Sequence, residues 1–360
     1  SESKAASTSA QSEAKSEAPA EEKSEAKSEA PAPAADVTVT IKVLTPNPDH
    51  GWTGAIGMFG QEVVDEINEA GKYKAELITS ASASEQVQQI EDIVANYAGD
   101  GSVAVAMLPQ DETVENAIQQ MIDAGIPFTE CDRLIASVKD AAVSNILYDN
   151  VEIGAAMAAY LTENGMKEGD KVVCFEGNNS SASTDRTDGF KKYLQGEIEY
   201  NGAKIENPWS SLDSVTFSGA LDWSQSNCQT YFENYMSTPG NETTKWLAGW
   251  DDGYTLGVLD ALEGSAIAKE TKETFLAGAP FISGCGGPEA IYAILRGESD
   301  SYTDITPSFG GIASVTYPPA MIKTTAYAMV DYLDGKDVPQ DNVQSAEVVT
   351  KDNVQNYVGF

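Results

Sequence analysis

The sequence predicts an α/β protein of two lobes, each a mostly parallel β-sheet flanked by helices. The chain has 360 residues, more than one ordinary hydrophobic core requires and enough for two. Short apolar runs alternate with helical stretches, and this alternation occurs in two successive series. Strands separated by helices of such length imply right-handed crossovers, and therefore parallel sheets with helices on both faces.

Residues 1–35 precede this pattern and differ from it in composition. They consist almost entirely of Ser, Ala, Glu, Lys and Pro, with the near-repeats SEAKSEAPA and SEAKSEAPAPAA. Such a segment cannot bury a core, so we expect a disordered linker. Tethers of this composition commonly follow the lipid-modified cysteine of Gram-positive lipoproteins. We therefore expect an extracellular, cell-surface lipoprotein or a periplasmic protein, attached to the membrane only through an N-terminal lipid anchor.

The first series begins at Asp36. The strand-like VTVTIKVL leads through PNPDHG to a helix over 53–70, and two further strand–helix pairs follow before IPFTEC closes the series. A second series begins near Ala142 with AVSNI. It continues through the strands KVVCFEG, KWLAGW and PFISGC, with helices over 151–164, 185–194, 221–236, 253–262 and 288–295. GIASVTY and a long helix after Pro318–Pro319 end the pattern, and AEVVT adds a short strand.

Charge and cysteine content narrow the class of function. The chain carries 22 basic and 56 acidic residues, a net charge of −34, which disfavours binding to nucleic acids and to anionic membranes. No apolar run reaches the roughly 18 residues of a membrane span, so we expect a soluble chain. The four cysteines are far apart and the only histidine is His50, which gives no support to a metal site. We expect buried reduced thiols, with disulfides left open, and no metal or cofactor.

Polar and aromatic residues gather where predicted strands end. In open parallel sheets ligands lie beyond the carboxyl ends of the strands, beside helix N-termini. A sugar needs flat aromatic surfaces for its C–H faces and charged planar groups for its hydroxyls. The candidate ligand-binding residues are His50, Trp52, Asp132, Arg133, Asn178, Arg186, Trp223, Trp250, Asp251 and Tyr317. Structural alternatives exist for them, such as core packing for the tryptophans and helix capping for Asp251.

Several stretches together resemble a known family. IPFTECDR, NILYDNVEIGAAMAAYL, STDRTDGFKKYL and WDDGYTLGVLDAL, with the closing strand–Tyr–Pro–Pro–helix segment, resemble the ribose/galactose-type periplasmic binding proteins over about residues 37–350. The resemblance implies the type I fold, with two Rossmann-like lobes joined by a three-strand hinge. Residues 36–148 plus 318–344 would form the N-terminal lobe, and residues 149–317 plus 345–360 the C-terminal lobe.

The resemblance also implies residue roles. Asp132 and Arg133 would bind sugar hydroxyls from the first lobe, while Arg186 and Asp251 would do so from the second. Trp223 would stack on the sugar ring, opposite Trp52 with His50 beside it. The sequence departs from the family pattern in two places: Gly286 stands where a ligand-binding carboxylate is common, and Tyr317 stands where a glutamine is common. These departures indicate a reshaped pocket.

The implied function is that of a solute-binding protein of a bacterial ABC importer. It would be a non-enzymatic monomer that closes over a sugar and is recognised by the transporter permease. Which sugar it takes, and whether a nucleoside or sugar alcohol replaces it, stays open. One alternative is a sensor that presents its ligand to a chemoreceptor or sensor kinase. Another is a glycoside-acting enzyme with Asp132 and Asp251 as acid and base. A DNA-binding repressor is disfavoured because a disordered tail stands in place of a helix-turn-helix.

Overall fold

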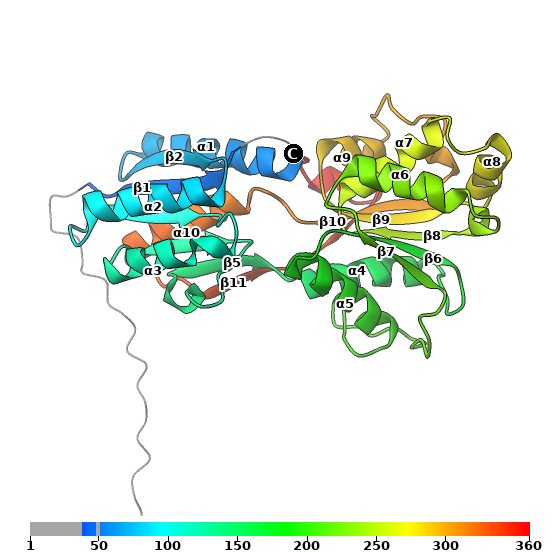
Figure 1. Ribbon diagram of the computed structural model, residues 1–360, viewed down its shortest axis with the longest axis horizontal. Helices are drawn as coiled ribbons and strands as arrows, with labels where there is room; N and C mark the ends of the chain where they lie inside the picture. Colours follow the sequence, from blue (N-terminus) through cyan, green and yellow to red (C-terminus); the bar gives the residue numbers. More distant parts are fainter. Residues whose placement is uncertain (1–37, 48–50) are drawn as a thin grey trace, which may run out of the picture. The chain divides into compact units, whose positions relative to one another are not determined.

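A computed structural model describes residues 38–47 and 51–360 (Figure 1). The predicted linker over residues 1–35 and the candidate ligand residue His50 lie outside the described residues. Within the described part, helices and strands alternate along most of the chain, as the apolar pattern predicts. No helix in this part combines the length and apolar character needed to cross a membrane.

The first sheet has the strand order β11-β5-β4-β3-β1-β2, and all its pairs are parallel. Helices α1 and α10 share one apolar cluster with this sheet, and α2 and α3 share another. The apolar residues of both faces are therefore buried. The strands are β1 (Thr40–Pro46), β2 (Lys74–Ser80), β3 (Val103–Met107), β4 (Phe128–Cys131), β5 (Ser144–Tyr148) and β11 (Asp341–Gln344), and the helices are α1 (Gly51–Ala70), α2 (Ala83–Tyr97), α3 (Glu115–Asp123) and α10 (Met321–Leu333).

The second sheet has the order β12-β10-β9-β8-β6-β7, parallel except that β12 runs antiparallel to β10. Helix α4 lies on one face with α5 packed against it, and α6, α7 and α9 lie on the other (Figure 1). The strands are β6 (Val172–Glu176), β7 (Val215–Ala220), β8 (Trp246–Gly249), β9 (Phe281–Gly286), β10 (Gly311–Thr316) and β12 (Val348–Val349). The helices are α4 (Asn150–Glu163), α5 (Ser181–Leu194), α6 (Gln225–Met236), α7 (Asp252–Glu263), α8 (Lys269–Ala277) and α9 (Glu289–Arg296). Short 3₁₀ helices span Glu112–Val114, Lys139–Ala141, Asn241–Thr243, Thr306–Ser308 and Val354–Asn356.

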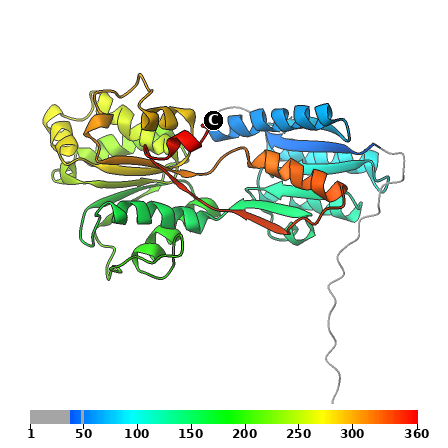
Figure 2. The same ribbon diagram turned by 180° about the vertical axis from the view of Figure 1, so that it is seen from behind.

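The chain passes from one sheet to the other three times: after β5, after β10 and after β11 (Figures 1 and 2). These crossings fall at Tyr148–Asp149, Tyr317–Ala320 and Ser345–Glu347. The chain returns to the first lobe for α10 and β11 before β12 completes the second sheet, so neither lobe is formed by one continuous stretch. This arrangement confirms the predicted fold class, including its three-strand hinge.

Some boundaries differ from the sequence prediction for local reasons. The helix predicted over 221–236 starts only at Gln225, because Asp222 and Trp223 adopt left-handed backbone angles (φ 56° and 57°) and Ser224 caps the helix. The sequence prediction lacks β7, β11 and α8. Strand β11 reads DNVQ and lies at the edge of its sheet, so it lacks the apolar alternation that marks a half-buried strand.

Two glycines allow α4 and α5 to touch. A Cβ atom at Gly154 would lie 2.0 Å from the Arg186 carbonyl oxygen, and one at Gly189 would lie 1.9 Å from the Val151 carbonyl oxygen. No real Cβ tolerates such distances, so these two positions require glycine. The close contact holds α5, and Arg186 with it, against the start of α4.

The first sheet buries an ionisable group. Glu130 on β4 is fully buried, and neither of its carboxyl oxygens has a hydrogen-bond partner. Burial raises the pKa of Glu130 to about 8, against smaller lowering effects of the Ile135 backbone and the Lys139 charge. The folded protein therefore holds a proton on Glu130 at neutral pH, which the unfolded chain releases above its ordinary pKa of 4.5.

We predict that Glu130→Gln removes a pH dependence of stability. In the wild type, the folded state binds more protons at Glu130 than the unfolded state between about pH 4.5 and 8. This group's contribution to stability therefore falls as pH rises, by at most about 1.4 kcal/mol per unit. Urea unfolding of both proteins at pH 5 and pH 8 measures the effect. The free energy of unfolding of the variant, minus that of the wild type, should be larger at pH 8 than at pH 5. An equal difference at both pH values would contradict the assignment.

Candidate functional site

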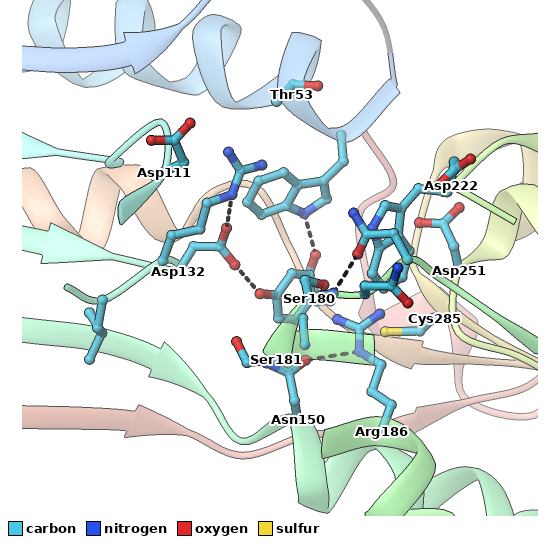
Figure 3. Close-up of a pocket in the computed structure, with 18 of the residues that line it drawn as sticks. Thr53, Asp111, Asp132, Asn150, Ser180, Ser181, Arg186, Asp222, Asp251 and Cys285 are labelled. Atoms are coloured by element: carbon cyan, nitrogen blue, oxygen red, sulfur yellow. Dashed lines mark hydrogen bonds and ion pairs between the residues drawn. The ribbon is translucent and has the colours of Figure 1, made fainter. Parts of the chain in front are cut away.

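A pocket of about 710 Å³ lies between the carboxyl ends of strands from both sheets (Figure 3). In each sheet the strand order reverses beside the first strand of the series, at β1 and β3 and at β6 and β8. Such switch points are where ligands bind in open α/β sheets, because the loops diverge there. The first lobe contributes residues 52–53, 110–112 and 132–135, and the second contributes residues 150, 178–182, 186, 222–223, 251 and 285–286; Tyr317 comes from the second crossing.

A row of aromatic rings and a guanidinium runs across the pocket. The rings of Trp52 and Tyr317 stack with centroids 5.5 Å apart and an interplanar angle of 26°. The Arg186 guanidinium carbon lies 4.7 Å from the Tyr317 ring and 5.4 Å from the Trp223 ring. The row therefore begins on α1 of the first lobe, passes through the hinge, and ends in the second lobe.

Arg186 is buried at the centre of this row. Its Nε donates to Asn150 Oδ1 at 2.8 Å (Figure 3), and its Nη1 donates to the Trp250 carbonyl. Burial alone lowers the pKa of Arg186, but Cys285, Tyr317 and nearby carboxylates raise it above its usual value. The guanidinium is therefore charged and fixed in orientation, with its position set by the α4–α5 contact.

Asp132 and Tyr317 are joined by a hydrogen bond. The Tyr317 hydroxyl donates to Asp132 Oδ1, and Trp52 Nε1 donates to the Tyr317 carbonyl at 2.8 Å. Burial and the Asp132 charge raise the pKa of Tyr317 well above its usual value, so the phenol keeps its proton. Arg133 Nε lies 3.5 Å from Asp132 Oδ2, and its Nη1 donates to the Gln110 carbonyl at 2.7 Å. The predicted Asp–Arg pair thus has fixed partners, Tyr317 from the second crossing and Gln110 from the first lobe.

Asp251 both caps a helix and lines the pocket. Its Oδ1 accepts from the Gly253 amide at 2.6 Å at the start of α7. Burial raises the pKa of Asp251, while the Gly253 amide and Arg186 act in the opposite direction. The Asp251 side chain is therefore both a helix cap and a pocket-lining residue.

Three of the six non-glycine residues with positive φ in the described part of the chain line this pocket. Asp132, Asp222 and Trp223 have φ values of 65°, 56° and 57°, in the left-handed region that costs a non-glycine residue about 1–3 kcal/mol. The Trp223 amide donates to the Tyr254 hydroxyl at 2.9 Å, and a Cβ at Gly177 would lie 2.3 Å from the Trp223 ring. The surrounding structure thus holds the indole in place against its backbone preference.

The structure brings most predicted site residues together. Those lining the pocket are Trp52, Asp132, Arg133, Asn178, Arg186, Trp223, Asp251 and Tyr317. Trp250 does not line it: its ring is fully buried against Phe190, and its Nε1 donates to Thr187 Oγ1 at 2.9 Å. Trp250 directly follows β8, and its side chain packs in the core. Only its carbonyl reaches the site, where it accepts from Arg186.

Other lining residues escaped the sequence prediction. They include Gln110, Asp111, Asn150, Ser180, Asp222 and Cys285. Gln110 follows the third predicted strand and Asp222 directly precedes Trp223, so both could have been predicted from their positions in the sequence. Asn150 also follows a predicted strand, but its contact with Arg186 of a different helix has no signal in the sequence.

The cysteines and possible metal ligands are also placed. All four cysteines are free and buried, and Cys285 lies at the pocket wall (Figure 3). Burial raises the pKa of the Cys285 thiol to about 12, although Arg186 lowers it in part. Over residues 38–47 and 51–360, no group of three or more His, Cys, Asp or Glu side chains is arranged to hold a metal ion.

The fold has two lobes, with a pocket at the switch points of both sheets. A family model described as "Periplasmic binding protein domain" matches residues 41–337. The chain belongs to this family, which confirms the resemblance seen in the sequence.

Individual relatives are more distant. The fructose import binding protein FruE of Bifidobacterium longum is 23% identical over 237 residues, which is 64% of this chain and 62% of that protein, less than two thirds of its length. A periplasmic solute-binding protein of an ABC transporter from Actinobacillus succinogenes, solved with D-allose, has a TM-score of 0.66 at 18% identity and covers 89% of this chain and 100% of that chain. A solute-binding protein from Bacillus halodurans, solved with myo-inositol, has a TM-score of 0.63 at 20% identity and covers 89% and 97%. At these identities the structural likeness concerns the fold.

Proposed function

We propose that this protein is the extracytoplasmic solute-binding protein of a bacterial ABC importer, and that it captures an uncharged sugar in the pocket between its lobes. The observation that carries the proposal is the row of Trp52, Tyr317, Arg186 and Trp223 across that pocket. Aromatic planes suit the C–H faces of a sugar ring, and a fixed guanidinium suits its hydroxyls. The ligands of the distant relatives, fructose, D-allose and myo-inositol, are polyhydroxy compounds of the same kind.

The charges that line the pocket favour a neutral ligand. Five carboxylates lie there with two guanidiniums: Asp111, Glu112, Asp132, Asp222 and Asp251 with Arg133 and Arg186. An anionic ligand would meet a surplus of negative charge in a partly desolvated site. A neutral polyol can donate to the carboxylates and accept from the guanidiniums without adding charge. We therefore expect sugar acids and sugar phosphates to be excluded.

Closure would couple binding to transport. We take residues 36–148 plus 318–344 as one moving lobe and residues 149–317 plus 345–360 as the other, hinged at the three crossings. A ligand that contacts both lobes binds the closed state more tightly and shifts the population toward it. The permease would recognise that closed state. A lipid anchor preceding the linker would keep this monomeric protein at the cell surface.

A hydrolytic role has little support from the two carboxylates proposed for it. Asp132 already accepts from Tyr317, and Asp251 accepts from the amide that begins α7. Both are held as hydrogen-bond acceptors, whereas a general acid needs a proton to give. Binding without chemistry therefore accounts for the site better.

A ligand panel followed by thermal unfolding tests the proposed function. The panel contains D-fructose, D-allose, L-arabinose, D-galactose and myo-inositol, with D-galacturonate as the charged partner of D-galactose. A ligand at 100 times its Kd adds about 2.7 kcal/mol to the stability of the folded state, so the midpoint should rise by several degrees. We expect a rise with at least one neutral compound and none with D-galacturonate. No rise with any neutral compound, or conversion of a bound sugar into product, would exclude the proposal.

Substitution at the second-lobe end of the row tests the location of the site. We expect Trp223→Ala to weaken binding of the sugar found in the panel at least tenfold, because a stacking surface is lost. Arg186→Ala should weaken it further, because a charged donor is lost as well. The control is Arg296→Ala on α9, which removes ion pairs with Glu289 and Glu298 away from the pocket. Calorimetric affinities equal to the wild type in both site variants would place the ligand elsewhere.

A further inference from the structure

Tyr317 contacts residues on both sides of the pocket. Its ring lies against Trp52 and Arg186, and the ring of Tyr148 meets it edge-on with centroids 5.5 Å apart. Its hydroxyl and its carbonyl are both engaged, by Asp132 and by Trp52. Only 9% of the residue is exposed.

The spacing around this ring leaves no room for a second one. Stacked aromatic rings have centroids about 4.5–7 Å apart, and Trp52 and Tyr317 are already at 5.5 Å. The Arg186 guanidinium carbon is 4.7 Å from the same ring. A sugar ring therefore cannot enter between Tyr317 and Trp52, or between Tyr317 and Arg186, without displacing the phenol. The pocket volume of about 710 Å³ exists with the phenol in place.

The phenol also occupies part of the hydrogen-bonding capacity of Asp132. One carboxylate oxygen accepts from the Tyr317 hydroxyl, and the other lies 3.5 Å from Arg133 Nε. A ligand hydroxyl that approaches Oδ1 must share that oxygen with the phenol. Removing the hydroxyl would leave a partly buried acceptor in need of a donor, which only a correctly placed ligand hydroxyl or water could supply.

We infer that Tyr317 is the specificity-determining residue of this site. Its ring limits how deeply a sugar ring enters, and its hydroxyl determines which ligand hydroxyl can donate to Asp132. The inference rests on the proposed function. It assigns to one side chain both the size limit and the hydroxyl pattern of the ligand. Tyr317 lies in the hinge, so the residue that selects the ligand is also part of a segment that joins the lobes.

A purely structural role for Tyr317 makes a different prediction. If the residue only supported the hinge, its substitution would lower the affinity for every ligand by a similar factor. A specificity role changes the affinities of the ligands by different factors, because each ligand meets the altered volume and the freed acceptor differently. The ratios between affinities are therefore the informative readout.

The experiment compares the wild type, Tyr317→Phe, Tyr317→Ala and the control Tyr148→Phe by isothermal titration calorimetry. Tyr148 touches the same ring but is not among the residues lining the pocket, and the substitution keeps its aromatic plane. The probes are the best neutral sugar from the panel, its single deoxy analogues and its methyl glycosides. Circular dichroism verifies folding. If Tyr317→Ala does not fold, Tyr317→Phe, which loses a single oxygen atom, carries the test.

We expect Tyr317→Phe to change the affinity ratio between the parent sugar and at least one deoxy analogue by about tenfold in favour of the hydroxylated compound. Tyr317→Ala should gain affinity for at least one methyl glycoside relative to the parent sugar. Tyr148→Phe should keep the wild-type affinity ratios. Uniform losses across all probes, or unchanged affinity ratios in both Tyr317 variants, would overturn the inference while leaving the proposed function intact. A wild type that binds no neutral sugar would instead overturn the proposed function, and the inference with it.

Discussion

A buried guanidinium at the junction of two sheets is the constraint on which this site depends. Arg186 is 3% exposed, and a charge in that position is tolerated only with fixed polar partners and facing rings. Asn150, the Trp250 carbonyl and the Tyr317 and Trp223 rings supply them. These partners come from α4, from the end of β8, from the hinge and from the strained turn before α6. Holding the charge therefore requires most of the second lobe to be in place.

The same constraint explains features that otherwise look unrelated. Gly154 and Gly189 let α4 and α5 meet, so the start of α4 lies beside Arg186. Gly177 leaves room for the Trp223 ring, and two successive left-handed residues turn that ring toward the guanidinium. On the other side of the guanidinium, Tyr317 stacks on Trp52 and donates to Asp132, both of the first lobe. The two lobes thus meet through side-chain contacts at the place where, in our proposal, a sugar binds.

The sequence predicted the architecture because apolar periodicity and strand ends are local signals. It likewise predicted that Asp132, Arg186 and Trp223 converge, since the carboxyl ends of parallel strands meet at one edge. It failed where a role depends on contacts distant in sequence. Trp250 stands at a strand end like the others, yet its ring turns into the core and only its carbonyl serves the site. The contact of Asn150 with Arg186 and the burial of Glu130 have no local pattern, and β11 is too polar to be recognised as a strand.

The central claim is that residues from both lobes grip one neutral ligand in the pocket between them. A crystal structure with the best sugar of the panel tests this most directly. The account predicts density for one sugar within hydrogen-bonding distance of Arg186, with its ring against Trp223 and at least one hydroxyl bound by Asp132 or Arg133 of the first lobe. A sugar bound to a single lobe only, or outside the pocket, would contradict it.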